Sequence, residues 1–305
     1  MTAVVRWWTA PVPLARVALL RTVLYLFVIV DMFLFVNDVV PHGYAPEFYK
    51  PLLIGRILPL PTPTPTVVHV LQYVLIGACL VAASGRLPRL AGWTVAVCFL
   101  EWLVIGMSYG KVDHDHLALI VAVLVLPTVG RARFRDLTPS EAAGWALRCI
   151  QVAVILTYFL SAVAKSIRSG WPWGWANGAV FVWAISRRGS DLARNLLEHP
   201  EVLRLAQWGL IMVELLSPVV LFLKGRLLAL AALFFLSFHL VTYLAIGIHF
   251  LPTVVCWLAF APLERLLGLG RRAARVPPAP MTGEGAARDD VPSPSSTTGA
   301  QPASR

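Results

Sequence analysis

The sequence predicts an all-α fold, a polytopic integral membrane bundle of seven or eight helices with a disordered C-terminal tail. Hydrophobic residues fill 58% of its 305 positions and charged residues only 14%, and the mean hydropathy is +0.72. A soluble domain has about 25% charged residues. Apolar runs recur along the chain, and a helix needs about 20 such residues to cross a bilayer. Because the runs are continuous rather than alternating, they argue against a membrane β-barrel.

Eight apolar runs mark the expected spans of a membrane domain over residues 10–265. In chain order they cover 17–36, 67–83, 92–109, 117–129, 145–165, 206–223, 227–247 and 250–263. The fourth and eighth are short, and Pro252 lies in the eighth, so we expect seven or eight complete spans. Trp7 and Trp8 suit the membrane interface before the first run. That run lacks a small-residue cleavage site, so we expect a retained span rather than a removed signal peptide.

Basic residues set the expected orientation, because Lys and Arg enrich the cytoplasmic ends of spans. They occur before the first span, between the second and third, after the fourth, between the sixth and seventh, and after the eighth. Both termini should therefore be cytoplasmic in the plasma membrane, which places all seven histidines at or near the outer face. The segment 166–205 falls outside although it carries five arginines. We expect part of it to re-enter the membrane or lie flat on it.

The net charge of +10 needs no nucleic-acid partner. Most of it belongs to the anchor pattern, which suits membrane lipids with anionic headgroups, and no basic groove or nucleic-acid motif is present. The four cysteines fall within spans without metal spacing, so we expect them to pack as small apolar residues. Residues 271–305 are rich in Pro, Gly, Ser, Thr and Ala, a composition typical of a disordered cytoplasmic tail.

The densest polar cluster lies in YGKVDHDHLALIVAVLVLP (109–127), between the third and fourth spans. It contains Asp113, His114, Asp115 and His116. An HxH pair with a carboxylate could bind a metal ion, and a solvated turn with helix-capping aspartates would look the same. A His–Asp couple at a membrane surface also suits proton handling or substrate binding. We favour this last interpretation and expect no metal.

A second cluster lies in TYFLSAVAKSIRSGWPWGWANGAVF (157–181), where Lys165 ends an apolar helix. Such a lysine can extend its amine to the interface. Alternatively, a low-dielectric site favours the neutral amine, which can act as a base. Trp171, Trp173 and Trp175 follow at alternate positions, as an interfacial belt or as the wall of an aromatic pocket.

The third cluster, FFLSFHLVTYLAIGIHFLP (234–252), places His239 inside the seventh span with Tyr243 one turn later. A histidine inside a span usually faces the bundle and has a partner, so it either bonds a neighbouring helix or binds substrate. Glu214 is the deepest intramembrane carboxylate and needs a Lys or His partner from across the bundle. The sequence has no nucleophile elbow, P-loop or dinucleotide fingerprint.

Three short segments carry a family resemblance: YFLSAVAKSIRSGW (158–171), DHDHL (113–117) and FHLVTY (238–243). Together, over residues 10–265, they make the chain similar to the HTTM family, named for its horizontally transferred transmembrane domain. That domain is also the membrane part of vitamin K-dependent γ-glutamyl carboxylase. Its members include bacterial membrane proteins.

The resemblance implies chemistry on a reduced quinone such as vitamin K hydroquinone. Lys165 takes the place of the family's lysine base, His114 that of its functional histidine, and His239 lies in the matching Phe-His-Leu segment. This chain has Asp113 where the enzyme has Asn, and it lacks the large extramembrane domain that helps to hold a protein substrate. We therefore expect chemistry other than full peptide carboxylation.

The expected site gathers these residues in one cavity at the outer face. Its catalytic residues are Lys165 and His114, and its substrate-binding residues are His239, Tyr243, Asp113, His116 and Trp171. The expected cofactor is a reduced quinone, and the reaction would be carboxylase-like or a quinone-dependent lyase or oxidoreductase step. The alternative is a non-catalytic membrane partner or maturation factor for a secreted peptide or an electron-transfer chain.

Overall fold

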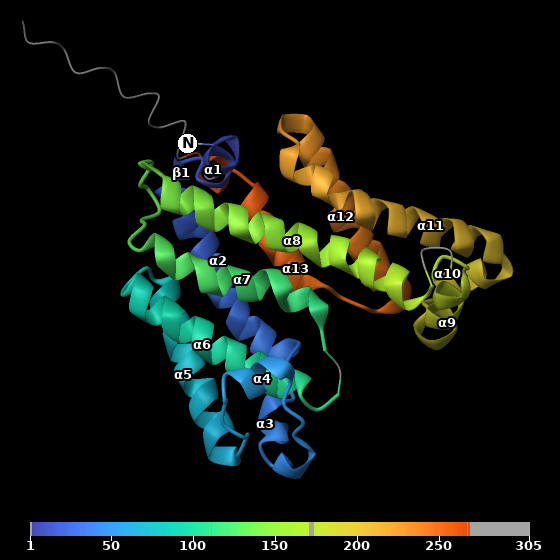
Figure 1. Ribbon diagram of the computed structural model, residues 1–305, viewed down its shortest axis with the longest axis horizontal. Helices are drawn as coiled ribbons and strands as arrows, with labels where there is room; N and C mark the ends of the chain where they lie inside the picture. The colour runs from blue at the N-terminus through green and yellow to red at the C-terminus, as the bar shows by residue number, and fades with distance from the viewer. Residues whose placement is uncertain (1, 111, 171–173, 267, 269–305) are drawn as a thin grey trace, which may run out of the picture.

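The computed structural model of the chain describes residues 2–110, 112–170, 174–266 and 268. Trp171 and the expected tail, 271–305, lie outside the described residues. The described chain is helical apart from one antiparallel pair of two-residue strands, β1 (Val12–Pro13) and β2 (Pro139–Ser140). The predicted all-α class is therefore confirmed (Figure 1).

Six helices in the described part of the chain are long and apolar enough to cross a membrane. They are α2 (Leu14–Leu34), α5 (Pro65–Ala83), α6 (Pro88–Met107), α8 (Glu141–Arg168), α11 with η5 (Pro200–Leu216 and Ser217–Phe222) and α12 (Gly225–Ile246). The predicted fourth and eighth spans are shorter apolar stretches, His114–Val129 and Leu251–Phe260. They comprise η2 (His114–His116), α7 (Leu117–Val125), η3 (Leu126–Val129), α13 (Leu251–Cys256) and η6 (Trp257–Phe260). These lengths are compatible with a multi-pass membrane protein.

The long helices begin two to six residues before the apolar runs that predicted them. Proline occupies the first turn of α5, α6 and α11. N–H groups of the first turn make no hydrogen bond within the helix, so the N–H that proline lacks is not needed there. The Thr64 and Ser140 hydroxyls accept backbone N–H bonds at the starts of α5 and α8, as N-caps do. Hydropathy misses these turns because capping residues are polar.

Between α8 and α11, the described residues 174–199 contain short helices that lie at one end of both (Figure 1). They are α9 (Ala179–Arg188), α10 (Asp191–Arg194) and η4 (Asn195–Glu198). The Ser190 N–H donates to the Ala245 carbonyl oxygen at 2.9 Å, which ties the start of α10 to the end of α12. The other short elements are α1 (Ala3–Trp8), α3 (Val39–His42), η1 (Pro46–Phe48), α4 (Leu53–Ile57) and α14 (Leu263–Leu266).

The core lies between α2, α5, α6, α7 and α8, around large buried side chains such as Leu24, Phe99 and Trp102. Helix α12 lies at the edge of this core, and only Phe235, which belongs to the core, and His239 are buried on it. Its exposed leucines suit contact with lipid, because lipid chains are as apolar as they are.

Arg21, near the start of the first predicted span, is buried at 1% exposure. Its guanidinium donates to the carbonyl oxygens of Gly130 and Ala132 at 2.9 and 3.1 Å. It thus binds backbone carbonyls just after η3, where an apolar bundle leaves them without water.

The first and last described elements lie at the same end of the bundle (Figure 1). Arg16 at the start of α2 forms a two-pronged ion pair with Glu264 of α14, with N–O distances of 2.7 and 2.9 Å. The elements α1 and α14 thus lie on one side, and the cytoplasmic location of both termini stays a prediction.

Candidate functional site

Most histidines gather where α2, α6 and α12 end and where α7 and α13 begin. We call this the histidine end. His42 stacks on Tyr109, with ring centroids 3.8 Å apart, and His249 packs on Phe35 at 4.3 Å. Burial raises the pKa of the Tyr109 hydroxyl, which donates to the His42 carbonyl oxygen at 2.9 Å. These contacts join the loops that leave α2 and α6.

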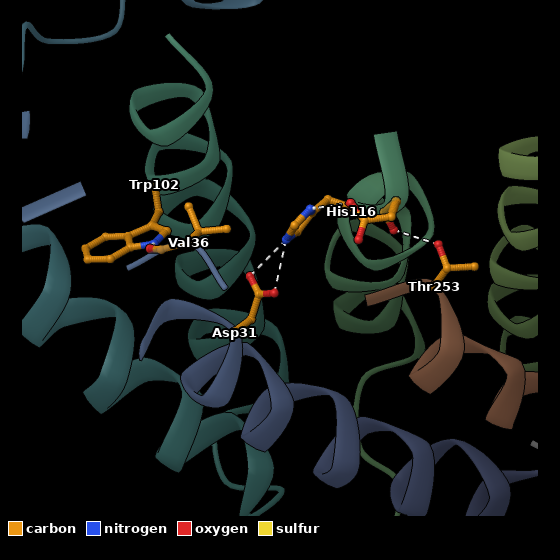
Figure 2. A network of polar contacts seen from close by, with 6 residues as sticks. Asp31, Val36, Trp102, His116 and Thr253 are labelled. Atoms are coloured by element: carbon orange, nitrogen blue, oxygen red, sulfur yellow. Dashed lines mark hydrogen bonds and ion pairs between the residues drawn. The ribbon is translucent and has the colours of Figure 1, made fainter. Parts of the chain in front are cut away.

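His116 lies between two carboxylates at the histidine end (Figure 2). Its Nε2 lies 3.0 and 3.2 Å from the Asp31 oxygens, and its Nδ1 lies 3.1 Å from Asp115 Oδ1. Asp31 is fully buried and His116 is 3% exposed. With both carboxyl groups ionised, the doubly protonated imidazolium satisfies both contacts. We call these three residues the acid–histidine–acid cluster.

The cluster joins three helices. Asp31 lies in the last turn of α2, and His116 directly precedes α7. The Thr253 hydroxyl of α13 donates to the Asp115 carbonyl oxygen at 2.7 Å (Figure 2). Nearby, the Trp102 indole N–H of α6 donates to the Val36 carbonyl oxygen at 3.0 Å. The chain at the end of α2 is therefore held by His116 through Asp31 and by Trp102 through Val36.

His239 forms a second polar contact, with Tyr158 of α8. The Trp257 indole N–H donates to the Tyr158 hydroxyl oxygen at 2.9 Å, so that hydroxyl can donate its own proton to His239 Nε2, 2.7 Å away. A neutral His239 then carries its ring proton on Nδ1. That nitrogen is buried and has no hydrogen-bond partner among the described residues. Phe238 and Phe250 flank the ring, with centroids at 5.3 and 5.1 Å.

Lys165 pairs with Glu214. Its Nζ lies 2.7 and 2.6 Å from the two carboxylate oxygens, and the Lys165 and Glu214 side chains are 21% and 7% exposed. The Trp175 ring covers the amine, with its centroid 4.8 Å away. Glu214 thus has the lysine partner from across the bundle that the sequence called for. The amine faces a carboxylate of α11 rather than extending alone to the interface.

The structure places the other predicted residues as follows. His114 is exposed, and its ring centroid lies 6.2 Å from that of Phe250, the phenyl ring that His239 also contacts. Asp113 lines a cavity of about 200 Å³ beside the ends of α2 and α6. Tyr243 is 53% exposed, and the hydroxyl that contacts His239 is that of Tyr158.

The three polar groups are related through α8 and α13. Tyr158 and Lys165 are seven residues apart on α8, which puts them on one face about 10 Å apart along the axis. Phe250, Thr253 and Trp257 follow one another by about a turn and contact His239, Asp115 and Tyr158 respectively. A single cavity shared by Lys165, His114 and His239 stays a prediction.

Several residues of this site received no role from the sequence. Tyr158 stands in a quoted segment, but nothing in a single sequence pairs it with His239, 81 positions away. Thr253 and Trp257 look like ordinary residues of an apolar run. Among the described residues, no group of three or more His, Cys, Asp or Glu side chains is arranged to hold a metal ion.

The fold and the site together define the class of protein. It is a helical chain whose described residues include six helices of membrane-spanning length and a buried polar cluster at one end. No family model, curated protein or solved structure matches the chain. The resemblance to the HTTM family stays a prediction from the quoted segments.

Proposed function

We propose that the protein is a multi-pass membrane enzyme of the HTTM type that acts on a reduced quinone or another lipid-soluble phenol at the histidine end. The observation that carries the proposal is the buried His239 Nδ1 without a partner. A buried donor left unpaired costs about 1–3 kcal/mol, so it calls for an explanation. A hydroxyl or carbonyl oxygen of a ligand would satisfy it.

The side chains around His239 are aromatic, which supports a quinone ring as the ligand. Phe250, Phe238 and Trp257 supply aromatic faces around the imidazole and its tyrosine partner, and such faces bind flat aromatic ligands by stacking. Tyr158 holds the imidazole by its other nitrogen, which leaves Nδ1 as the donor. A quinone bound there supplies redox chemistry, and the chain supplies binding and proton transfer.

The Lys165–Glu214 pair supplies the base. An ammonium beside a carboxylate and an amine beside a carboxylic acid hold the same number of protons. In either form the pair accepts one more proton, which leaves Lys165 as ammonium and Glu214 as acid. The ammonium then holds the negative charge on the oxygen that lost the proton. The sequence assigned the base to Lys165 alone, and the 2.6 Å contact favours a shared role.

The acid–histidine–acid cluster positions this site. Thr253 binds the Asp115 carbonyl, and Phe250 stands one turn before it. The cluster therefore helps to fix the phenyl ring that contacts both His114 and His239.

Co-purification tests the binding step. We would extract the protein in mild detergent and measure quinones by mass spectrometry in wild type, His239→Leu and His199→Leu. His199 is the matched control because its side chain is 61% exposed. We expect a bound quinone in wild type and the control, and its loss in His239→Leu. Equal quinone content in all three would overturn the proposal.

Glu214→Gln separates the enzyme from the non-catalytic alternative. The amide keeps the size and an acceptor for Lys165, but it cannot take up a proton. We expect consumption of added vitamin K hydroquinone in air-saturated buffer to fall at least about a hundredfold, the contribution typical of a general base. Unchanged secreted-peptide maturation or electron transfer in cells that carry this variant would instead favour a maturation factor or scaffold.

A further inference from the structure

A second site lies at the start of α11, apart from the histidine end. It is a cleft of about 520 Å³, within the usual range for small-ligand sites, and we call it the headgroup cleft. Its lining residues are Ala176, Asn177, Glu201, Arg204, Leu205 and Trp208. The last four are spaced i, i+3, i+4 and i+7, so they share one face of α11.

The wall opposite α11 is held in place by several contacts. The buried Gln207 donates to the Trp175 carbonyl oxygen at 2.7 Å. Gly178 has φ +97°, a conformation that suits glycine, and it packs against Arg204 of α11. The Ala179 N–H donates to Asn177 Oδ1 at 2.9 Å, leaving the Asn177 amide nitrogen as a donor.

The cleft carries one charge of each sign. In the part of the chain that the structure describes, Arg204 forms no ion pair, and Glu201 has only a contact of 3.7 Å with the exposed His199. Both charges are therefore open to a ligand. Leu205 and Trp208 continue the same face of α11 with apolar surface, and Leu205 is 73% exposed.

The position of α11 sets the depth of the cleft. The apolar stretch Pro200–Phe222 has 23 residues and would be about 34 Å long as a helix, close to the roughly 30 Å hydrocarbon thickness. If α11 spans the membrane, Glu201 and Arg204 lie in the headgroup layer. Trp208 lies about 10 Å deeper than Glu201 and about 6 Å deeper than Arg204, at the level of the acyl chains.

We infer that the headgroup cleft binds a zwitterionic phospholipid of the phosphatidylethanolamine type. Arg204 and Asn177 donate to the phosphate, Glu201 accepts from the ammonium, and the acyl chain runs along Leu205 and Trp208. Arginine suits phosphate because its donors match the oxygens. Phosphatidylglycerol has the same phosphate but no ammonium, so Glu201 disfavours it. The inference does not depend on the proposed enzyme activity.

Native mass spectrometry of the protein from nanodiscs with equal phosphatidylethanolamine and phosphatidylglycerol tests this. We expect wild type to retain phosphatidylethanolamine roughly tenfold over phosphatidylglycerol, the effect of one charge-assisted hydrogen bond. Arg204→Gln should reduce retention of both lipids roughly tenfold. Arg194→Gln, at a 56% exposed side chain of α10, is the matched control and should change neither.

Glu201→Gln tests the recognition of the ammonium group. It should leave total lipid binding in place and abolish the preference for phosphatidylethanolamine. Equal binding of the two lipids by wild type would overturn the inference, as would unchanged retention by Arg204→Gln. Both residues are exposed, so folding should survive, and thermal melting checks this.

Discussion

At the scale of single residues, the buried imidazole of His116 neutralises much of the charge of two carboxylates. Asp31 has no exposed surface, so in an apolar bundle it depends on His116 for its partner. A buried charge pair adds little net stability against apolar residues, but loss of one partner is costly because it strands the other. The cluster is therefore sensitive to substitution at its centre.

His116→Leu should lower the free energy of unfolding by about 3–5 kcal/mol, because it leaves two carboxylates without their shared partner. His114→Leu, at the exposed position two residues earlier, should change it by less than about 0.5 kcal/mol. Denaturant titration in detergent micelles measures both. Equal stability of the two variants would show that the cluster does not hold the fold.

Tyr158→Phe should lower stability by about 1–3 kcal/mol, because the Trp257 N–H and His239 Nε2 both lose their partner. It should also weaken hydroquinone binding, since nothing then keeps the His239 proton on Nδ1. Tyr243→Phe, at a residue that is 53% exposed, is the control and should change neither property. Thermal melting and hydroquinone titration measure the two effects, and a silent Tyr158→Phe would contradict the described contact.

At the scale of elements, the Arg16–Glu264 pair fastens α14 to the start of α2. Glu264 is 3% exposed. Burial opposes its ionisation, but the Arg16 hydrogen bonds and charge outweigh burial and lower the pKa of Glu264 below its ordinary value of 4.5. A carboxyl with a lowered folded-state pKa stabilises the fold above its unfolded pKa and loses that contribution as the pH falls through its folded pKa.

Wild type should therefore lose stability as the pH falls below about 4.5, and Arg16→Gln should reduce this loss. At neutral pH the variant should be less stable by about 2 kcal/mol, as expected for lost hydrogen bonds to a charged group. Melting temperatures from pH 7 to pH 3 measure both effects. Arg6→Gln, on the short exposed helix α1, is the control, and parallel pH curves for wild type and Arg16→Gln would refute the assignment.

At the scale of the whole molecule, the first and last described elements, α1 and α14, lie at one end and most histidines at the other. The charge pattern adds a direction, with Arg86 in a cytoplasmic loop and His114 outside. In a variant without native cysteines, a membrane-impermeant maleimide added to intact cells should label His114→Cys and not Arg86→Cys. The reverse pattern would invert the topology, and labelling of both would show that the intervening segment does not cross the membrane.

The sequence by itself determined the helical class, and its eight predicted spans include all six long apolar helices of the described residues, because burial in lipid depends on local composition and length alone. It also picked out His116, His239, Lys165 and Glu214, since a polar group in an apolar run stands out without any knowledge of its neighbours. The predicted need of Glu214 for a basic partner followed from the same reasoning.

Only the tertiary structure decided which of these groups meet. Asp31 and His116 are 85 positions apart, and Lys165 and Glu214 are 49 apart, and their contact depends on how each helix is rotated and packed. The short 3₁₀ turn His114–His116 likewise exposes one histidine and buries the other. The hydrophobic pattern of a uniformly apolar run does not show which face of the helix turns toward the bundle, because every face of such a helix is equally apolar.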